Sequence, residues 1–311
     1  MKRTVPVLCE ESLTDEELFM AAYKGHQMNP DKFEKSQIKI IILVLPLVII
    51  TAIPIIFIFF HAFKPMEELF AFPPKFITTN PTLDNFRKLM KASRSAGIPI
   101  SKYVFNSIFI TVVVVFGSLL FSTMAAYSLS KLRYKGRLTM MKINQIALMF
   151  VSCAVMIPRY LIVNKLGLID TFFAQILPLM ALPVGLFLVK QFVDQVPDSL
   201  IEAAYMDGAK EWTIYLKVIL PLIKPAIATA AILVFQQVWT NLEASNYYVN
   251  DESLKSLAFY MNTLASGSTS NTVAGQGISA AASLIMFLPN LILFCILQRQ
   301  VMNTMAYSGI K

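Results

Sequence analysis

Residues 202–221 read Glu-Ala-Ala-Tyr-Met-Asp-Gly-Ala-Lys-Glu-Trp-Thr-Ile-Tyr-Leu-Lys-Val-Ile-Leu-Pro and lie between two long apolar segments. This stretch is polar, favours helix, and contains a glycine and a closing Leu-Pro pair. Such a composition is unusual for a short loop between membrane spans. It therefore predicts a structured helical segment with a task of its own.

Composition places the rest of the chain in a membrane. Hydrophobic residues make up 56% of the 311 residues and charged residues only 15%, which is too little charge to cover a soluble domain of this length. The apolar residues form blocks that are long enough to cross a bilayer, which takes roughly 20 residues per helix. We therefore expect an all-α integral membrane protein.

Six membrane spans are predicted from these blocks. They cover residues about 40–60, 104–129, 142–159, 171–189, 225–242 and 278–297, and the third is short for a span. The basic run 131–137 predicts that both termini lie inside, because Lys and Arg gather on the cytoplasmic side of membrane proteins. The first outer loop, about 63–103, carries seven basic residues and opposes this orientation, but long loops translocate despite their charge.

The chain is predicted to hold one integral domain between two short tails. Residues 1–38 are expected to form a cytoplasmic tail, in which a capping-box pattern at 14–17 predicts a short amphipathic helix. Residues 39–299 would form the membrane domain and 300–311 a cytoplasmic tail. Within the outer loops, short helices are predicted at 82–90, with Thr82 as the cap, and at 254–265.

Several function classes find no support in the sequence. There is no G-x-x-x-x-G-K-[ST] phosphate loop, the two histidines stand alone, and the three cysteines lack metal-ligand spacing. The net charge of +8 fits Lys and Arg that flank membrane spans better than a nucleic-acid partner. A self-powered carrier would need ionisable groups buried at mid-membrane, and Glu243 is the best candidate in spans that are almost free of them. Energy is therefore expected to come from elsewhere.

Local signals divide the segment 194–224 into two helices. Asp198 or Ser199 is predicted to cap the first helix and Gly208 to end it or permit a turn. The second is predicted at about 211–218, and Pro221 and Pro225 are predicted to stop it and to set the entry into the fifth span. Ala204 and Gly208 are small and one helical turn apart, which predicts a face that can enter a groove on another protein.

This segment resembles the EAA loop in the permease subunits of bacterial ABC importers. The loop has the pattern Glu-Ala-Ala, three residues, Gly, nine residues, Ile, one residue, Leu-Pro. The residues that match at the right spacing are Glu202, Ala203, Ala204, Gly208, Leu220 and Pro221, with Val218 where the pattern prefers Ile. A plain interfacial helical hairpin would fit the local physics as well, but the spaced set is specific and stands before the next-to-last span.

The resemblance extends over most of the chain from about residue 40 and is strongest to the sugar-importer branch, which includes the smaller maltose permease subunit. Residues 81–86, 125–137 and 221–225 are similar to that branch, whereas 302–305 depart from it. A sugar or oligosaccharide would then be the substrate. A permease for another substrate class is the alternative, and a stand-alone carrier is a more distant one.

Family resemblance also implies the fold, the location and the partners. It implies a type I ABC importer permease fold, N-in and C-in, with cytoplasmic coupling helices, in the inner membrane of a bacterium. The implied partners are a homologous second permease, two ATPase subunits or domains, an extracytoplasmic solute-binding lipoprotein and the lipid bilayer, without nucleic acid. ATP and Mg²⁺ would act on the ATPase subunits, so this chain would hold no cofactor and would not be an enzyme. The residues that match the EAA pattern, together with Asp207, would couple the permease to the ATPase subunits.

A translocation path is predicted on the fifth span. Gln236, Thr240, Glu243 and Tyr247 are spaced i, i+4, i+7 and i+11, and would therefore line one helix face with Trp239 nearby. Polar side chains inside a membrane helix face protein or a water-filled cavity. A sugar path and hydrogen bonding to a partner permease explain this face equally well.

Overall fold

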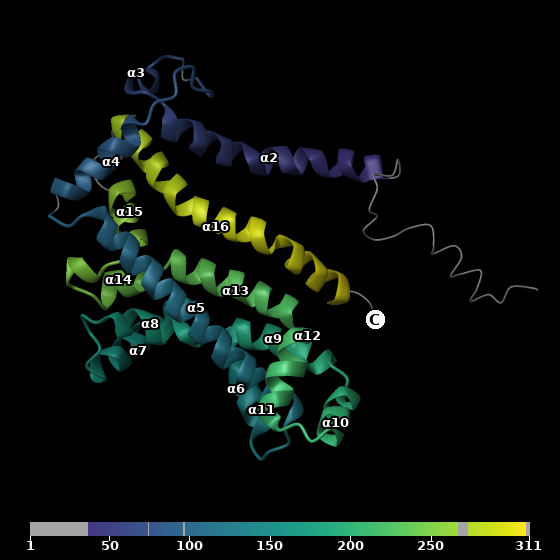
Figure 1. Cartoon of the computed structure of the whole chain (residues 1–311). Helices are drawn as coiled ribbons and strands as arrows, with labels where there is room; N and C mark the ends of the chain where they lie inside the picture. Colours follow the sequence, from purple (N-terminus) through teal and green to yellow (C-terminus); the bar gives the residue numbers. More distant parts are fainter. Residues whose placement is uncertain (1–36, 74, 96, 267–272, 309–311) are drawn as a thin grey trace, which may run out of the picture. The chain divides into compact units, whose positions relative to one another are not determined.

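The computed structural model describes residues 37–73, 75–95, 97–266 and 273–308. The helix predicted in the amino-terminal tail and the last residues of the chain lie outside these ranges. Within them the chain is helical and contains no strand (Figure 1). The chain divides into a unit of residues 1–56 and a larger unit of residues 57–311. The described part of the first is most of α2 (Gln37–Phe63), an apolar helix whose side chains up to residue 56 are almost all exposed.

Four helical segments are long and apolar enough to cross a membrane. They are Ile38–Phe63 in α2, Ile100–Lys131 (α5), Phe172–Gln195 and Gly275–Gln298 in α16 (Val273–Ser308). Two bent pairs bring the number to six if each pair counts as one span. The prediction of about six spans therefore agrees with the structure, although two of the six are strongly bent helix pairs.

The third predicted span is one of these bent pairs. A single helix over 142–159 is wrong, because α6 (Arg137–Met149) and α7 (Ser152–Lys165) meet at an angle of 114°. Phe150 and Val151 between them have extended backbones, and neither an aromatic nor a β-branched residue favours helix strongly. The fourth span is interrupted as well, between α8 (Phe172–Met180) and α9 (Pro183–Gln195), where Pro183 occupies a first-turn position.

The short helices complete the larger unit. They are α3 (Met66–Leu69), α4 (Asp84–Ser95), α10 (Asp198–Met206), α11 (Glu211–Ile214), a π-helix (Tyr215–Ile219), α12 (Leu220–Leu222), α13 (Lys224–Trp239), α14 (Glu243–Tyr247), a 3₁₀ turn (Glu252–Leu254) and α15 (Leu257–Ser266). The helix predicted at 254–265 is confirmed as α15. The predicted cap of α4 is wrong, because α4 begins at Asp84 and the Thr82 hydroxyl is buried without a partner among the described residues.

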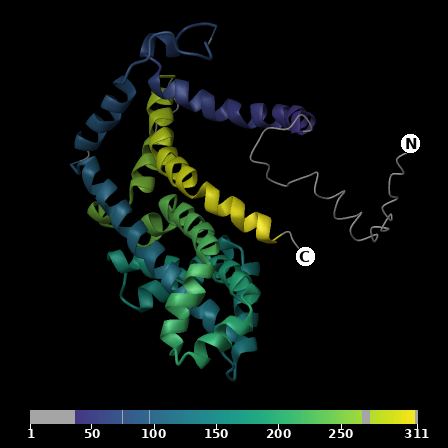
Figure 2. The same cartoon turned by 45° about the vertical axis from the view of Figure 1, so that its right-hand side comes forward.

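α5 is the central helix of the larger unit. It packs along α9, α13 and α8, and α13 packs in turn against α16 (Figures 1 and 2). Its carboxyl-terminal half shares a core with α9, α10 and the start of α13, while its amino-terminal half shares another with α4, α15 and α16. The segment from α10 to α12 is therefore mounted at one end of α5 and α15 at the other.

Candidate functional site

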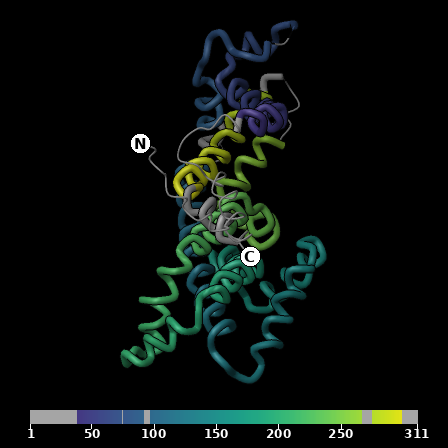
Figure 3. Tube along the Cα trace, turned by 90° about the vertical axis from the view of Figure 1, so that its right-hand side faces the viewer, coloured from purple at the N-terminus to yellow at the C-terminus, as the bar shows by residue number. Residues whose placement is uncertain are grey.

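α10 is fixed to the larger unit by one face. Ile201 is only 8% exposed and belongs to a core with Val193 and Val196, and Ala204 packs against the same core. The other residues of α10 lie at the surface, where the segment from α10 to α12 projects from the end of the unit (Figure 3). The apolar inner face thus holds the helix in place without occupying its outer face.

The start of α10 differs from the prediction. The helix begins directly after Pro197, and neither Asp198 nor Ser199 caps it with a side-chain hydrogen bond. Asp198 is the first helical residue, and its carboxylate accepts a hydrogen bond from Lys131 Nζ of α5 at 2.7 Å. An ion pair with a transmembrane helix has replaced the local cap, because a charged donor is the stronger partner.

Gly208 ends α10 as the sequence predicts. Its φ is +78°, in the left-handed region that side chains disfavour. The amide of Gly208 donates to Tyr205 O at 2.9 Å, and that of Ala209 donates to Ala204 O at 3.0 Å, which is the hydrogen-bond pattern of a Schellman motif. A residue with a Cβ at 208 would strain this turn and redirect the chain that follows.

The outward face of α10 is formed by Glu202, Ala203 and Met206, with Asp207 and Gly208 following at its end. Met206 is 88% exposed, so a large apolar side chain projects from the surface between the charged residues Glu202 and Asp207. The predicted face of Ala204 and Gly208 is wrong, because Ala204 is turned toward the core and Gly208 lies beyond the helix. Sequence reasoning missed Met206, although it stands within the quoted stretch.

A polar stripe on α5 binds the whole segment. Thr123, Tyr127 and Lys131, the α5 stripe, recur every four residues and so share one face of the helix. Lys131 Nζ binds Asp198 and donates to Val196 O at 2.6 Å, Tyr127 donates to Glu211 at 2.6 Å, and the Thr123 and Tyr215 hydroxyls lie 2.8 Å apart. Each stripe residue therefore holds a different part of the segment.

Electrostatics reinforce these contacts. The hydrogen bond from Lys131, its charge, and the charges of Arg133 and Arg137 lower the pKa of Asp198. The hydroxyl of Tyr205 donates to Glu211, and this bond raises the Tyr205 pKa. The basic run 131–137 is thus the electrostatic partner of the start of α10.

The second predicted helix is longer than expected. Helical structure continues from Glu211 through Leu222 and meets α13 at a bend of 79°, so the helix ends between Pro221 and Pro225, in agreement with the predicted stop. The π-helix over Tyr215–Ile219 precedes Pro221, and its wider turn relieves the clash that a proline ring makes with the carbonyl four residues earlier. Leu220 is half-buried against the core and Pro221 is exposed.

The residues predicted to line a translocation path do not form one helical stripe. α13 ends at Trp239 and α14 begins at Glu243, because Asn241 Oδ1 accepts the amide of Ala244 at 3.0 Å and so starts a new turn. Gln236, Thr240 and Tyr247 are exposed. Trp239 is buried and its Nε1 donates to Met286 O at 3.1 Å.

Glu243 is paired rather than free. Both of its carboxylate oxygens lie 2.9 Å from Arg159 Nη1 of α7, and the Tyr248 hydroxyl donates to it at 2.5 Å. Arg159 is another residue that sequence reasoning missed as a functional partner. The sequence did contain a signal for this role, because Arg159 is a charged residue in an otherwise apolar stretch. Such an arginine inside a membrane protein usually pairs with an acidic residue.

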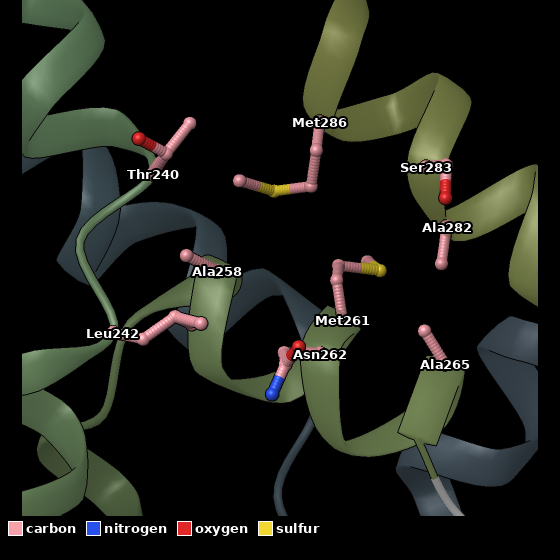
Figure 4. A pocket seen from close by; sticks show the side chains of 9 residues that line it. All are labelled: Thr240, Leu242, Ala258, Met261, Asn262, Ala265, Ala282, Ser283 and Met286. Carbon is pink, nitrogen blue, oxygen red and sulfur yellow. The ribbon is translucent and has the colours of Figure 1, made fainter.

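A cavity of 310 Å³ lies beside Thr240 (Figure 4). Thr240, Asn262 of α15 and Ser283 of α16 contribute its uncharged polar groups, and Met261 and Met286 contribute apolar surface. Within the described ranges no three His, Cys, Asp or Glu side chains are grouped to hold a metal ion. The cavity offers hydrogen bonding without charge.

Comparison with known proteins identifies the family. The model of the binding-protein-dependent transport system inner membrane components matches residues 38–301. The chain belongs to this family. It is therefore a multi-pass membrane component of a transport system, and the predicted family and functional class are confirmed.

Individual relatives agree with this assignment. Protein LplC of Bacillus subtilis is 32% identical over 280 residues, covering 84% of this chain and 90% of its own. The arabinooligosaccharides transport system permease protein AraQ of Halalkalibacterium halodurans is 30% identical over 268 residues, covering 84% and 92%. A crystal structure of a bacterial ABC transporter involved in alginate import has a chain with a TM-score of 0.73 at 23% identity, covering 87% of this chain and 99% of that one. The predicted type I importer permease fold is thus confirmed.

Proposed function

We propose that the chain is a permease subunit of an ATP-driven importer in the bacterial cytoplasmic membrane, and that it moves a sugar or oligosaccharide into the cell. The outward face of α10 is the observation that supports coupling to an ATPase. An exposed Met206 beside Glu202 and Asp207 stands on a helix whose back is packed and whose end is fixed by Gly208. This arrangement supports a role for α10 as a docking helix.

α10 would dock in a groove on a separate ATPase subunit, with its apolar residue as the anchor. Glu202, Ala203, Asp207 and Gly208 would make the contact, while Ala204, Leu220 and Pro221 would set the position of the helix. ATP and Mg²⁺ would be bound by the ATPase and not by this chain. ATP can bias the permease only through contacts that differ between its states, and α10 is the element placed to make them.

The substrate class is supported by relatives and by the cavity. Relatives at 28–32% identity include proteins named for the transport of arabinooligosaccharides and of trehalose. Sugar hydroxyls suit an uncharged lining such as that beside Thr240, and methionines can cover the apolar face of a ring. Gln236, Thr240 and Tyr247 would contact the path, with Trp239 and Glu243 holding the surrounding helices.

The remaining partners follow from the family. Its members depend on a binding protein, so a solute-binding lipoprotein would deliver the sugar on the outer side. Exposed Gln236 and Gln237 on α13 are expensive in lipid, so they would face the path or a homologous second permease. Both termini and α10 would lie in the cytoplasm.

Substitution of Met206 tests the coupling role. Because its side chain is 88% exposed, Met206→Asp should leave the helices folded while abolishing co-purification with the cognate ATPase and ATP-dependent uptake. Met206→Leu is the matched control and should retain both. A Met206→Asp complex that keeps its ATPase and its uptake would show that α10 is not the docking helix.

The substrate class is tested on the solute-binding protein of the same system. Calorimetric titration with a panel of neutral oligosaccharides, acidic oligosaccharides and amino acids should show binding only among the sugars. Binding of an amino acid alone would overturn the sugar assignment and leave the coupling assignment standing.

A further inference from the structure

Glu211 joins two helices that the proposed coupling must move together. Its carboxylate accepts a hydrogen bond from Tyr127 of α5 at 2.6 Å and another from Tyr205 of α10. Its two oxygens each take one hydroxyl. Glu211 therefore forms a bridge between the docking helix and the central transmembrane helix.

Apolar packing also links the two helices, because Ile201 and Ala204 of α10 belong to the core that includes Ala126 and Tyr127 of α5. A groove of 550 Å³ opens beside the bridge, lined by Tyr127, Glu211, Trp212 and Tyr215 with neighbours on α5. Glu211 therefore lies at the edge of this groove, outside the apolar core. Hydrogen bonds to a carboxylate are also directional and roughly twice as strong as those between neutral groups, so they fix orientation where packing cannot.

The rest of the α5 stripe holds other parts of the segment. Lys131 binds the start of α10, where Asp198 is 74% exposed, and Thr123 binds Tyr215 of the π-helix. Among the side-chain hydrogen bonds of the described residues, only those of Glu211 connect the last turn of α10, through Tyr205, to α5. This last turn is the part of α10 that carries Met206.

We infer that Glu211 is a positioning residue that transmits the displacement of α10 to α5. The inference rests on the proposed docking of α10 on an ATPase. Without the bridge, α10 remains folded and docked, but its last turn no longer has a hydrogen-bonded connection to α5, so its displacement reaches α5 less effectively. ATP hydrolysis then loses its response to the solute-binding protein, because that response requires the two sides of the permease to move together.

The experiment uses the complete complex of both permeases, the ATPase and the solute-binding protein, reconstituted in lipid. Glu211→Ala should retain the wild-type amount of ATPase and the basal rate of ATP hydrolysis. Its stimulation by the solute-binding protein should fall about tenfold, which corresponds to about 1.4 kcal/mol of coupling. Glu211→Gln, which keeps one acceptor oxygen, should be intermediate, and Glu67→Ala, an exposed glutamate on α3, is the matched control.

A second variant guards against simple misfolding. Tyr127→Phe removes one hydroxyl from α5 and leaves the bond between Tyr205 and Glu211 intact, so it should reproduce most of the loss of stimulation. Normal stimulation in both variants would overturn the inference. Loss of ATPase binding in Glu211→Ala would also overturn it, because Glu211 would then shape the docking face. Failure of the proposed function gives a different result, since Met206→Asp would then retain its ATPase.

Discussion

α5 is held in two different ways at its two ends. Near its amino terminus, Asn106 and Ser107, the α5 clamp, are buried and bind backbone. Asn106 Nδ2 donates to Ser253 O at 2.9 Å and to Lys255 O at 3.0 Å, and Ser107 Oγ accepts the amide of Leu257 at 2.7 Å. Near its carboxyl terminus, the α5 stripe reaches mainly for side chains, and Asp198 and Glu211 among them are exposed.

The difference separates a rigid end from an adjustable one. Short buried side chains bonded to backbone have one geometry, and a lost partner leaves polar groups unsatisfied. Long side chains bonded to exposed carboxylates can follow their partners and are screened by water. Ser107 and Thr123 stand roughly 24 Å apart along the helix at a rise of about 1.5 Å per residue. One helix thus connects an end bonded to backbone with the segment from α10 to α12, which is bonded through side chains.

The largest effect on stability is expected at the α5 clamp. Asn106 is 1% exposed, and Asn106→Leu would leave the carbonyls of Ser253 and Lys255 without their donor. A loss of about 2 kcal/mol is expected, seen as a lower midpoint of thermal unfolding in detergent. Asn246→Leu, at an exposed asparagine of α14, is the control. Equal midpoints for the two variants would mean that the buried hydrogen bonds of the α5 clamp do not stabilise the amino-terminal end of α5.

A somewhat smaller effect is expected at the ion pair between α7 and α14. The side chains of Arg159 and Glu243 are 31% and 20% exposed, so Arg159→Met should cost less than the loss of a fully buried pair, about 1–2 kcal/mol. The double variant Arg159→Met with Glu243→Met should recover most of that loss, because no charge is left alone. A double-mutant cycle on thermal unfolding measures the coupling, and additive losses would contradict it.

The sequence predicted those features that depend on neighbouring residues. Apolar blocks of sufficient length predicted the spans, and the spacing around Glu202 and Gly208 predicted α10 and its left-handed end. Gly208 was predictable because only a glycine takes φ of +78° without strain. These signals lie within a few residues of one another, so no tertiary information was needed.

Features that depend on tertiary contacts were missed. The partner of Glu243 is Arg159, which is 84 residues away. Asp198, predicted as a cap of α10, instead binds Lys131 of another helix. Which face of α10 points outward also depends on the core around Ile201, so Met206 could not be distinguished from Ala204 by spacing. The regular spacing of the α5 stripe was visible in the sequence, but its partners were not.

The smallest effect is expected at the ion pair between Lys131 and Asp198. Lys131 lowers the Asp198 pKa below its ordinary value of 3.8, so the bond is present above that value and is lost as pH falls through the lowered one. Lys131→Met should raise the titration midpoint of Asp198 toward 3.8, though not fully, because Arg133 and Arg137 remain. An NMR titration of the Asp198 carboxyl carbon measures both midpoints. The same midpoint in both proteins would mean that Lys131 does not hold α10, and the adjustable end of α5 would then depend on Thr123 and Tyr127 alone.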